Sequence, residues 1–154
     1  MYCVFVNHSE EHVVASDDDA ERLCGGLAEL PAFTVNVIGP GGRTGPSLDV
    51  IVSSERGLVS FLDMERGVKL ASRNPDCPER DIVRLRNEAY PELQLDQIEA
   101  ERRDLISPRQ AVAIMRHFLL TGEPIDLVPW PPDDWEDRPI DVEPGLPPGE
   151  EVPF

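Results

Sequence analysis

The chain has few residues of the kinds that build disulfide frameworks and zinc sites. Its 154 residues include three cysteines, Cys3, Cys24 and Cys77, which are widely spaced and form no C-x-x-C pair. An odd number of isolated cysteines argues against both a structural zinc site and a set of disulfides. We expect Cys3 and Cys24 to be small core residues and Cys77 to lie in a polar loop.

Long hydrophobic runs are also missing. No apolar stretch reaches the roughly 18 residues that a membrane-spanning helix needs, and the chain does not open on a basic start followed by an apolar signal segment. We therefore expect a cytoplasmic protein that does not contact the membrane.

Basic residues are scarce, since 14 Lys and Arg face 30 Asp and Glu and the formal net charge is −16. Contact with nucleic-acid phosphates or an anionic membrane relies on clusters of Lys and Arg, so neither is expected as a direct ligand. Such acidity favours a basic protein partner, because opposite potentials accelerate encounter. The alternative is that the acidity serves only solubility.

Catalytic motifs are absent as well. The sequence holds neither a G-x-S-x-G nucleophile elbow nor the H-x-E…P-C-x-x-C deaminase signature. The glycine-rich segment 39–46 matches no phosphate-binding motif, and its two prolines remove amides that a phosphate cradle would use, so we interpret it as a hairpin loop. We expect no enzymatic activity and no cofactor.

One metal-binding pattern occurs outside its usual setting. Residues 8–12, HSEEH, match H-x-x-E-H, in which two histidines one helical turn apart hold zinc. The flanking segments VFVN and VVAS predict strands, where His8 and His12 would not converge as they do on a helix. An exposed polar turn is the favoured interpretation, and a small metal-dependent hydrolase using His8 and His12 is kept as an alternative.

The clearest local signal is a helix over residues 108–121. Ser107 is a good N-cap, Pro108 suits the first helical position, and Gln110 completes a capping box. Gly122 predicts the left-handed residue that ends the helix. The apolar stripe has helical spacing and consists of Ala111, Val112, Ile114, Met115, Phe118 and Leu119.

The remaining elements follow from alternation and turn residues. Ser16 with Asp17, Asp18 and Asp19 predicts a helix start, and we expect this helix to reach Leu30 with Leu23, Leu27 and Leu30 inward. A hairpin is expected over 2–7 and 12–15, and an antiparallel meander over 33–38, 48–53, 58–63 and 68–72, with weaker strands over 82–86 and 94–100 and a short apolar segment over 125–128.

Together these elements predict an α+β domain over 1–130, with an antiparallel sheet and two main helices packed on one face. The segment 131–154 is expected to be an acidic, proline-rich tail that is partly disordered. Residues 124–154 contain nine of the 16 prolines and carry nine acids against one base, Arg138, which leaves too few apolar side chains for packing.

The segment that leaves the domain combines tryptophan with acids. Trp is enriched in interface hot spots, and an acidic rim suits a basic partner, although Trp130 could instead cover one end of the core. The residues that we expect to contact a partner are Trp130, Asp133, Asp134, Trp135 and Glu136, followed by Asp17, Asp18 and Asp19.

Four stretches carry a resemblance to a known family. They are YCVFVNH at 2–8, SDDDAERL at 16–23, PGGRTGPSLDV at 40–50 and ISPRQAVAIMRHFLLTGEPIDLVPW at 106–130. In order and content they resemble the Immunity protein 1 family of bacterial polymorphic toxin systems. The resemblance spans about residues 1–130. The chain departs from the family pattern in the highly charged segment 73–106 and in the long acidic tail.

The resemblance implies an α+β cytoplasmic protein that binds a cognate toxin domain in a 1:1 heterodimer and blocks its active site. The implied toxins include nucleic-acid deaminases, among them cytosine deaminases, and nucleases. An acidic protein would occupy their basic substrate groove. A DNA-mimic inhibitor of a host nucleic-acid-binding protein is the alternative interpretation of the same charge.

Overall fold

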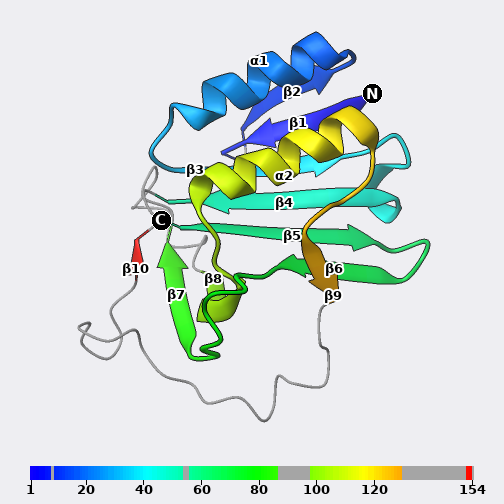
Figure 1. Cartoon of the computed structure of the whole chain (residues 1–154). Helices are drawn as coiled ribbons and strands as arrows, with labels where there is room; N and C mark the ends of the chain where they lie inside the picture. The colour runs from blue at the N-terminus through cyan, green and yellow to red at the C-terminus, as the bar shows by residue number, and fades with distance from the viewer. Residues whose placement is uncertain (8, 54–55, 87–97, 130–151, 154) are drawn as a thin grey trace.

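The computed structural model describes residues 1–7, 9–53, 56–86, 98–129 and 152–153 (Figure 1). These residues form an α+β structure in which both helices cover one face of a seven-stranded antiparallel sheet. A three-stranded sheet lies beside the lower end of the large one. The predicted fold class is therefore confirmed.

The large sheet has the strand order β2-β1-β3-β4-β5-β6-β9, and all neighbours are antiparallel. Its predicted meander, β3 to β6, is confirmed. The N-terminal hairpin is confirmed too, and the chain then returns through helix α1, Asp17–Ala28, to pair β3 with the other side of β1, so that β1 lies between β2 and β3. The strands are β1 Tyr2–Val6, β2 Glu10–Val14, β3 Phe33–Ile38, β4 Pro46–Val52, β5 Gly57–Asp63, β6 Val68–Ser72 and β9 Leu127–Pro129.

Helix α2, Pro108–Thr121, has the ends that its sequence predicts. The Ser107 hydroxyl accepts a hydrogen bond from the Gln110 amide at 3.1 Å. Gly122 adopts φ 77°, and its amide donates to the Phe118 carbonyl, which satisfies an otherwise unpaired helix terminus. The predicted stripe is buried except for Val112, which is half-buried.

Helix α1, Asp17–Ala28, begins where predicted but ends earlier. Ser16 caps it by accepting from the Asp19 amide at 3.2 Å. Beyond Ala28 the chain leaves the helix, so the expectation that Leu30 points inward is wrong; that side chain is 44% exposed. Leu27 is buried and Leu23 is half-buried.

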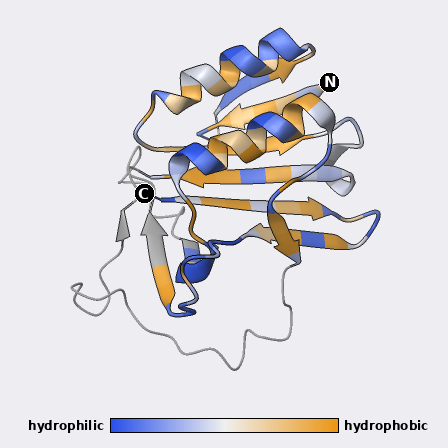
Figure 2. Cartoon of the chain, in the orientation of Figure 1, coloured by the Kyte–Doolittle hydropathy of each residue, from blue (hydrophilic) through white to orange (hydrophobic). Residues whose placement is uncertain are grey.

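The core lies between the helices and the sheet, and Figure 2 shows the alternation of apolar and polar residues along the strands. The Phe118 ring of α2 lies 5.4 Å from the Tyr2 ring and 5.9 Å from the Phe61 ring, measured between centroids. Cys24 is buried in this core as expected. Cys3 is only half-buried, because it alternates with buried Val4 along β1 and so lies on the face of the sheet away from the helices.

The small sheet has the order β10-β7-β8, from Val152–Pro153, Ile82–Arg86 and Ile98–Glu101. The strand over 82–86 is as predicted. The next one begins at Ile98, and residues 94–97 of its predicted range lie outside the described residues. Strand β10 pairs in parallel with β7. A second apolar cluster of Val83, Ala100 and Leu105 packs this region against Ile51 and Leu58.

Two short 3-10 helices complete the described chain, and the predicted loop 39–46 contains the first. They are η1, Gly42–Thr44, and η3, Arg102–Asp104. No helix among the described residues is long and apolar enough to span a membrane.

Candidate protein-binding surface

The predicted contact residues fall into two groups in the structure. Trp130, Asp133, Asp134, Trp135 and Glu136 lie outside the described residues, as does His8, so their arrangement stays a prediction. Asp17, Asp18 and Asp19 are described and form the first turn of α1.

Asp19 has a local structural role. Its carboxylate accepts a hydrogen bond from the Ala15 amide at 3.0 Å and lies 3.8 Å from the Arg22 guanidinium. The backbone hydrogen bond from Ala15 is the main cause that lowers the pKa of Asp19. Asp17 and Asp18 are exposed, so these two carboxylates are accessible at the helix start.

His12 lies on β2, as the predicted hairpin expects, but this strand already begins at Glu10, so the exposed polar turn favoured for residues 8–12 is wrong from Glu10 onward. The His12 Nε2 is 3.6 Å from the Glu10 carboxylate. No group of three or more His, Cys, Asp or Glu side chains with metal-binding geometry occurs in the described part of the chain. His12 instead lines a hollow at the edge of the large sheet.

This hollow, the α1–β2 groove, has a volume of about 340 Å³ and lies between the end strand of the sheet and α1. Glu10, His12 and Val14 form the strand wall, since they lie opposite core-facing residues of β1. Val13 of β2 also contributes to the lining, and the helix wall and the floor consist of Asp19, Arg22, Leu23, Gly26, Leu27, Leu30 and Val6. The groove is therefore apolar at its base and charged at its rim.

A second hollow adjoins the first. It has a volume of about 490 Å³ and lies between the end of α1 and the start of α2, where Ser107, Pro108 and Val112 line it. Leu27 and Leu30 line both hollows, so the two are adjacent.

Charge is uneven along the segment that builds the groove. Residues 10–30 contain seven acids and one base, Arg22. Two of the acids, Asp19 and Glu21, are ion-paired with Arg22 and Arg116 respectively. The acids of this segment are Glu10, Glu11, Asp17, Asp18, Asp19, Glu21 and Glu29. The groove thus lies in strongly negative surroundings.

Two glycines occur in the middle of α1 although helix interiors disfavour glycine. A Cβ added at Gly25 or Gly26 would meet no atom within 4 Å. Each glycine costs about 1 kcal/mol of helix stability relative to alanine. Gly26 lines the groove. The sequence shows these glycines, but only the structure shows that packing within the described chain does not require them.

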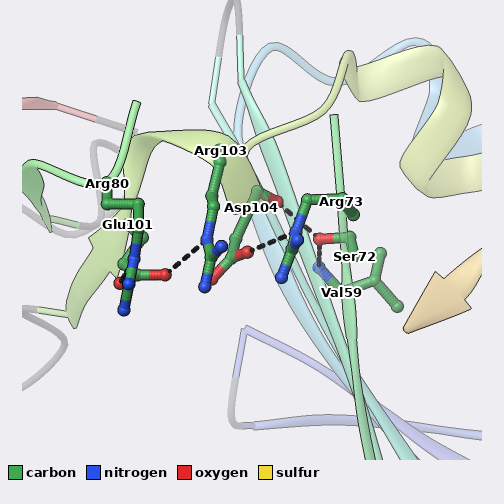
Figure 3. Close-up of polar contacts among 7 residues, drawn as sticks. All are labelled: Val59, Ser72, Arg73, Arg80, Glu101, Arg103 and Asp104. Atoms are coloured by element: carbon green, nitrogen blue, oxygen red, sulfur yellow. Dashed lines mark hydrogen bonds and ion pairs between the residues drawn. The ribbon is translucent and has the colours of Figure 1, made fainter. Parts of the chain in front are cut away.

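Two buried carboxylates, Glu101 and Asp104, lie elsewhere, at the junction of the two sheets (Figure 3). Glu101 accepts from Arg80 Nε at 3.2 Å and from Arg103 Nε at 2.8 Å. Asp104 accepts from Arg73 Nε at 3.3 Å. The sequence did not single out this network, because its members come from three separate segments.

Their surroundings shift the pKa values of Asp104 and Glu101 in opposite directions. Burial and the nearby Glu101 raise the pKa of Asp104, with Arg73 opposing. For Glu101, burial raises the pKa, but hydrogen bonds and charge from Arg103 and Arg80 outweigh it and leave the value lowered. A carboxylate pair with separated pKa values is a feature of acid–base catalysis. Here both carboxylates bind guanidinium groups, and neither lines the two hollows, so the network suits attachment of the small sheet.

No protein-family model matches the chain, and no curated protein matches it.

Proposed function

We propose that this protein is an immunity protein that binds a basic toxin domain and blocks its active site. The observation that carries the proposal is the α1–β2 groove, an apolar depression set in a segment with seven acids and one base. Protein interfaces combine an apolar core with a polar rim. The groove offers both, and the excess of acids in the surrounding segment 10–30 favours a basic partner.

Ion pairs between arginines and carboxylates of this chain also support a basic partner. Among the described residues, the arginines that form ion pairs with carboxylates of the same chain include Arg22, Arg66, Arg73, Arg80, Arg102, Arg103 and Arg116. Because these cations are already neutralised, the excess of acids dominates the field that a partner meets.

The partner that fits best is a toxin that acts on nucleic acid, such as a cytosine deaminase or a nuclease. Such an enzyme needs a basic groove to hold phosphates. An acidic protein that occupies this groove excludes the substrate by sterics and charge, so it needs no catalytic residue of its own. The complex would be a cytoplasmic 1:1 heterodimer.

The test is co-expression with the product of the gene immediately upstream. We expect a 1:1 complex on size-exclusion chromatography, loss of the toxin's activity on DNA or RNA, and protection of the host cell. Affinity should fall as salt rises, because surface charges are screened. A toxin that stays active in the presence of excess protein would contradict the proposal.

A DNA-mimic inhibitor of a host nucleic-acid-binding protein would share the same charge. The two functions differ in the partner that is recovered. A host DNA-binding protein bound in cells that lack the upstream gene would favour the mimic, whereas dependence on that gene product favours immunity.

A further inference from the structure

We infer that the outer edge of β2 receives an extended segment of the partner as an additional strand, with the partner's apolar side chains in the α1–β2 groove. The identity of the partner rests on the proposed function. The edge, the groove and their charge are features of this chain and are argued separately.

β2 is the end strand of the large sheet. It pairs with β1 along one edge, and no strand among the described residues pairs with its other edge. An end strand presents a row of backbone amides and carbonyls that another chain can pair with. In Figure 1, α1 runs alongside β2 at this end of the sheet, so an added strand would lie next to the helix.

The pleat determines which side chains an added strand would meet. Glu10, His12 and Val14 alternate along β2 on the helix side, where they form one wall of the groove. The side chains of Glu11 and Val13 have the opposite pleat, although Val13 also contributes to the groove lining at the strand edge. An added strand would therefore place alternate side chains into the groove, against Leu23 and Leu27.

Gly26 supplies the clearance that such a chain needs. It lines the groove, and the space where its Cβ would stand is open. Glycine is disfavoured inside a helix, and no neighbour in the described structure demands it here. A glycine at this position allows another backbone to approach the helix closely.

Charge restricts the choice of occupant. A second copy of β2 would bring two further carboxylates, Glu10 and Glu11, to an edge that already holds two, and this added like charge is unfavourable. A segment that alternates apolar residues with Lys or Arg reverses this sign. We therefore assign the edge to a basic, extended segment of the toxin domain and not to self-association.

A matched pair of variants, Gly26→Leu and Gly25→Leu, tests the groove: the first places a side chain in it, and the second is the control. Both positions lie in the interior of α1 with open space around the Cβ, so both variants should fold and be at least as stable as the wild type. Only Gly26 lines the groove. We expect G26L to weaken binding of the catalytically inactive toxin domain at least tenfold, and G25L to change it less than twofold.

Equal affinities of the two variants would overturn the inference and leave the proposed function intact. A wild-type protein that does not bind the toxin domain would instead remove the proposed function. In that case the peptide acetyl-KVKVKV-amide serves as the probe, with acetyl-EVEVEV-amide as its charge-reversed control.

The peptide experiment is a titration followed by amide chemical shifts. We expect the basic peptide to shift amides of β2 and α1 in the wild type and in G25L, with the effect lost in G26L and with the acidic control. Shifts that are absent from β2, or unchanged in G26L, would overturn the inference regardless of the toxin.

Discussion

The Ser72 hydroxyl donates a hydrogen bond to the main-chain carbonyl of Asp104 at a distance of 2.7 Å, 32 residues away in the sequence. The same oxygen accepts from the Val59 amide at 3.1 Å (Figure 3). Ser72 is fully buried. One hydroxyl thus joins β5, β6 and the η3 turn at the junction between the two sheets.

Replacing Ser72 with alanine should destabilise the protein by about 1 to 3 kcal/mol, because a buried amide and a buried carbonyl would lose their partner. Urea denaturation measures the difference. Ser60→Ala, at a half-buried position of β5, is the control and should stay within about 0.5 kcal/mol of the wild type. A Ser72→Ala protein as stable as this control would show that water replaces the hydroxyl.

Gly57→Ala and Gly26→Ala should change stability in opposite directions. A Cβ at Gly57 would lie 2.8 Å from the Ala111 Cβ and 3.1 Å from the Ser107 carbonyl oxygen, so α2 would have to move. We expect a loss of about 1 to 3 kcal/mol from this overpacking. Gly26→Ala should gain about 1 kcal/mol from helix propensity. Thermal unfolding of both variants tests the pair, and a stabilising Gly57→Ala would contradict the close approach.

The Asp81–Arg102 ion pair should make the free energy of unfolding decrease at acidic pH. Arg102 NH2 donates to Asp81 Oδ2 at 2.7 Å, and hydrogen bonding to Arg102 is the main cause that lowers the pKa of Asp81 below its ordinary 3.8. Because the pKa of Asp81 is lower in the folded than in the unfolded protein, the pair stabilises the fold fully above the unfolded-state pKa of 3.8. This stabilisation is lost as the pH falls through the pKa that Asp81 has in the folded protein.

Asp81→Asn should therefore cost about 2 kcal/mol at neutral pH, where the charged pair is intact. Its difference from the wild type should shrink as the pH is lowered below 3.8, because protonation of Asp81 also neutralises the wild-type carboxylate. Urea titrations at neutral pH and at a series of acidic pH values measure this, with exposed Asp76→Asn as the control. A difference that does not change with pH would attribute the effect to packing.

Cys24 should resist alkylation in the folded protein. Burial, helped by the charge of Glu21, raises the pKa of its thiol to about 11, so the reactive thiolate is rare at pH 8 as well as inaccessible. Iodoacetamide followed by peptide mass spectrometry should show Cys24 modified in urea but not in buffer. Rapid modification in buffer would mean that the α1 layer opens readily.

The start of α1 and both ends of α2 could be predicted because their signals are local. Ser16, Ser107 and Gly122 act within three or four residues of themselves, through hydrogen bonds that any helix end requires. Strands β3 to β6 were predictable for the same reason, since alternation and turn residues recur along one continuous segment. The end of α1 was not, because no left-handed glycine marks it and the apolar spacing continues to Leu30.

The groove and the buried network depend on which distant segments meet. Nothing near Gly26 indicates that it would face a hollow beside the end strand, and nothing near Glu101 indicates that Arg80 and Arg103 would surround it. The partner contacts predicted between Trp130 and Glu136 stay predictions, because these residues lie outside the described part of the chain. Asp17 and Asp18 are exposed at the start of α1, the helix that lines the groove.

The sequence by itself determined the excess of acids, the fold class, the caps and the strand faces, since composition, capping and alternation require no knowledge of distant neighbours. Tertiary structure alone decided that the chain returns through α1 to pair β3 with the far side of β1, that β2 ends the sheet, and that ion pairs surround the buried carboxylates at the junction with the small sheet. These outcomes depend on which distant segments pair and bury one another, and the local sequence does not specify those partners.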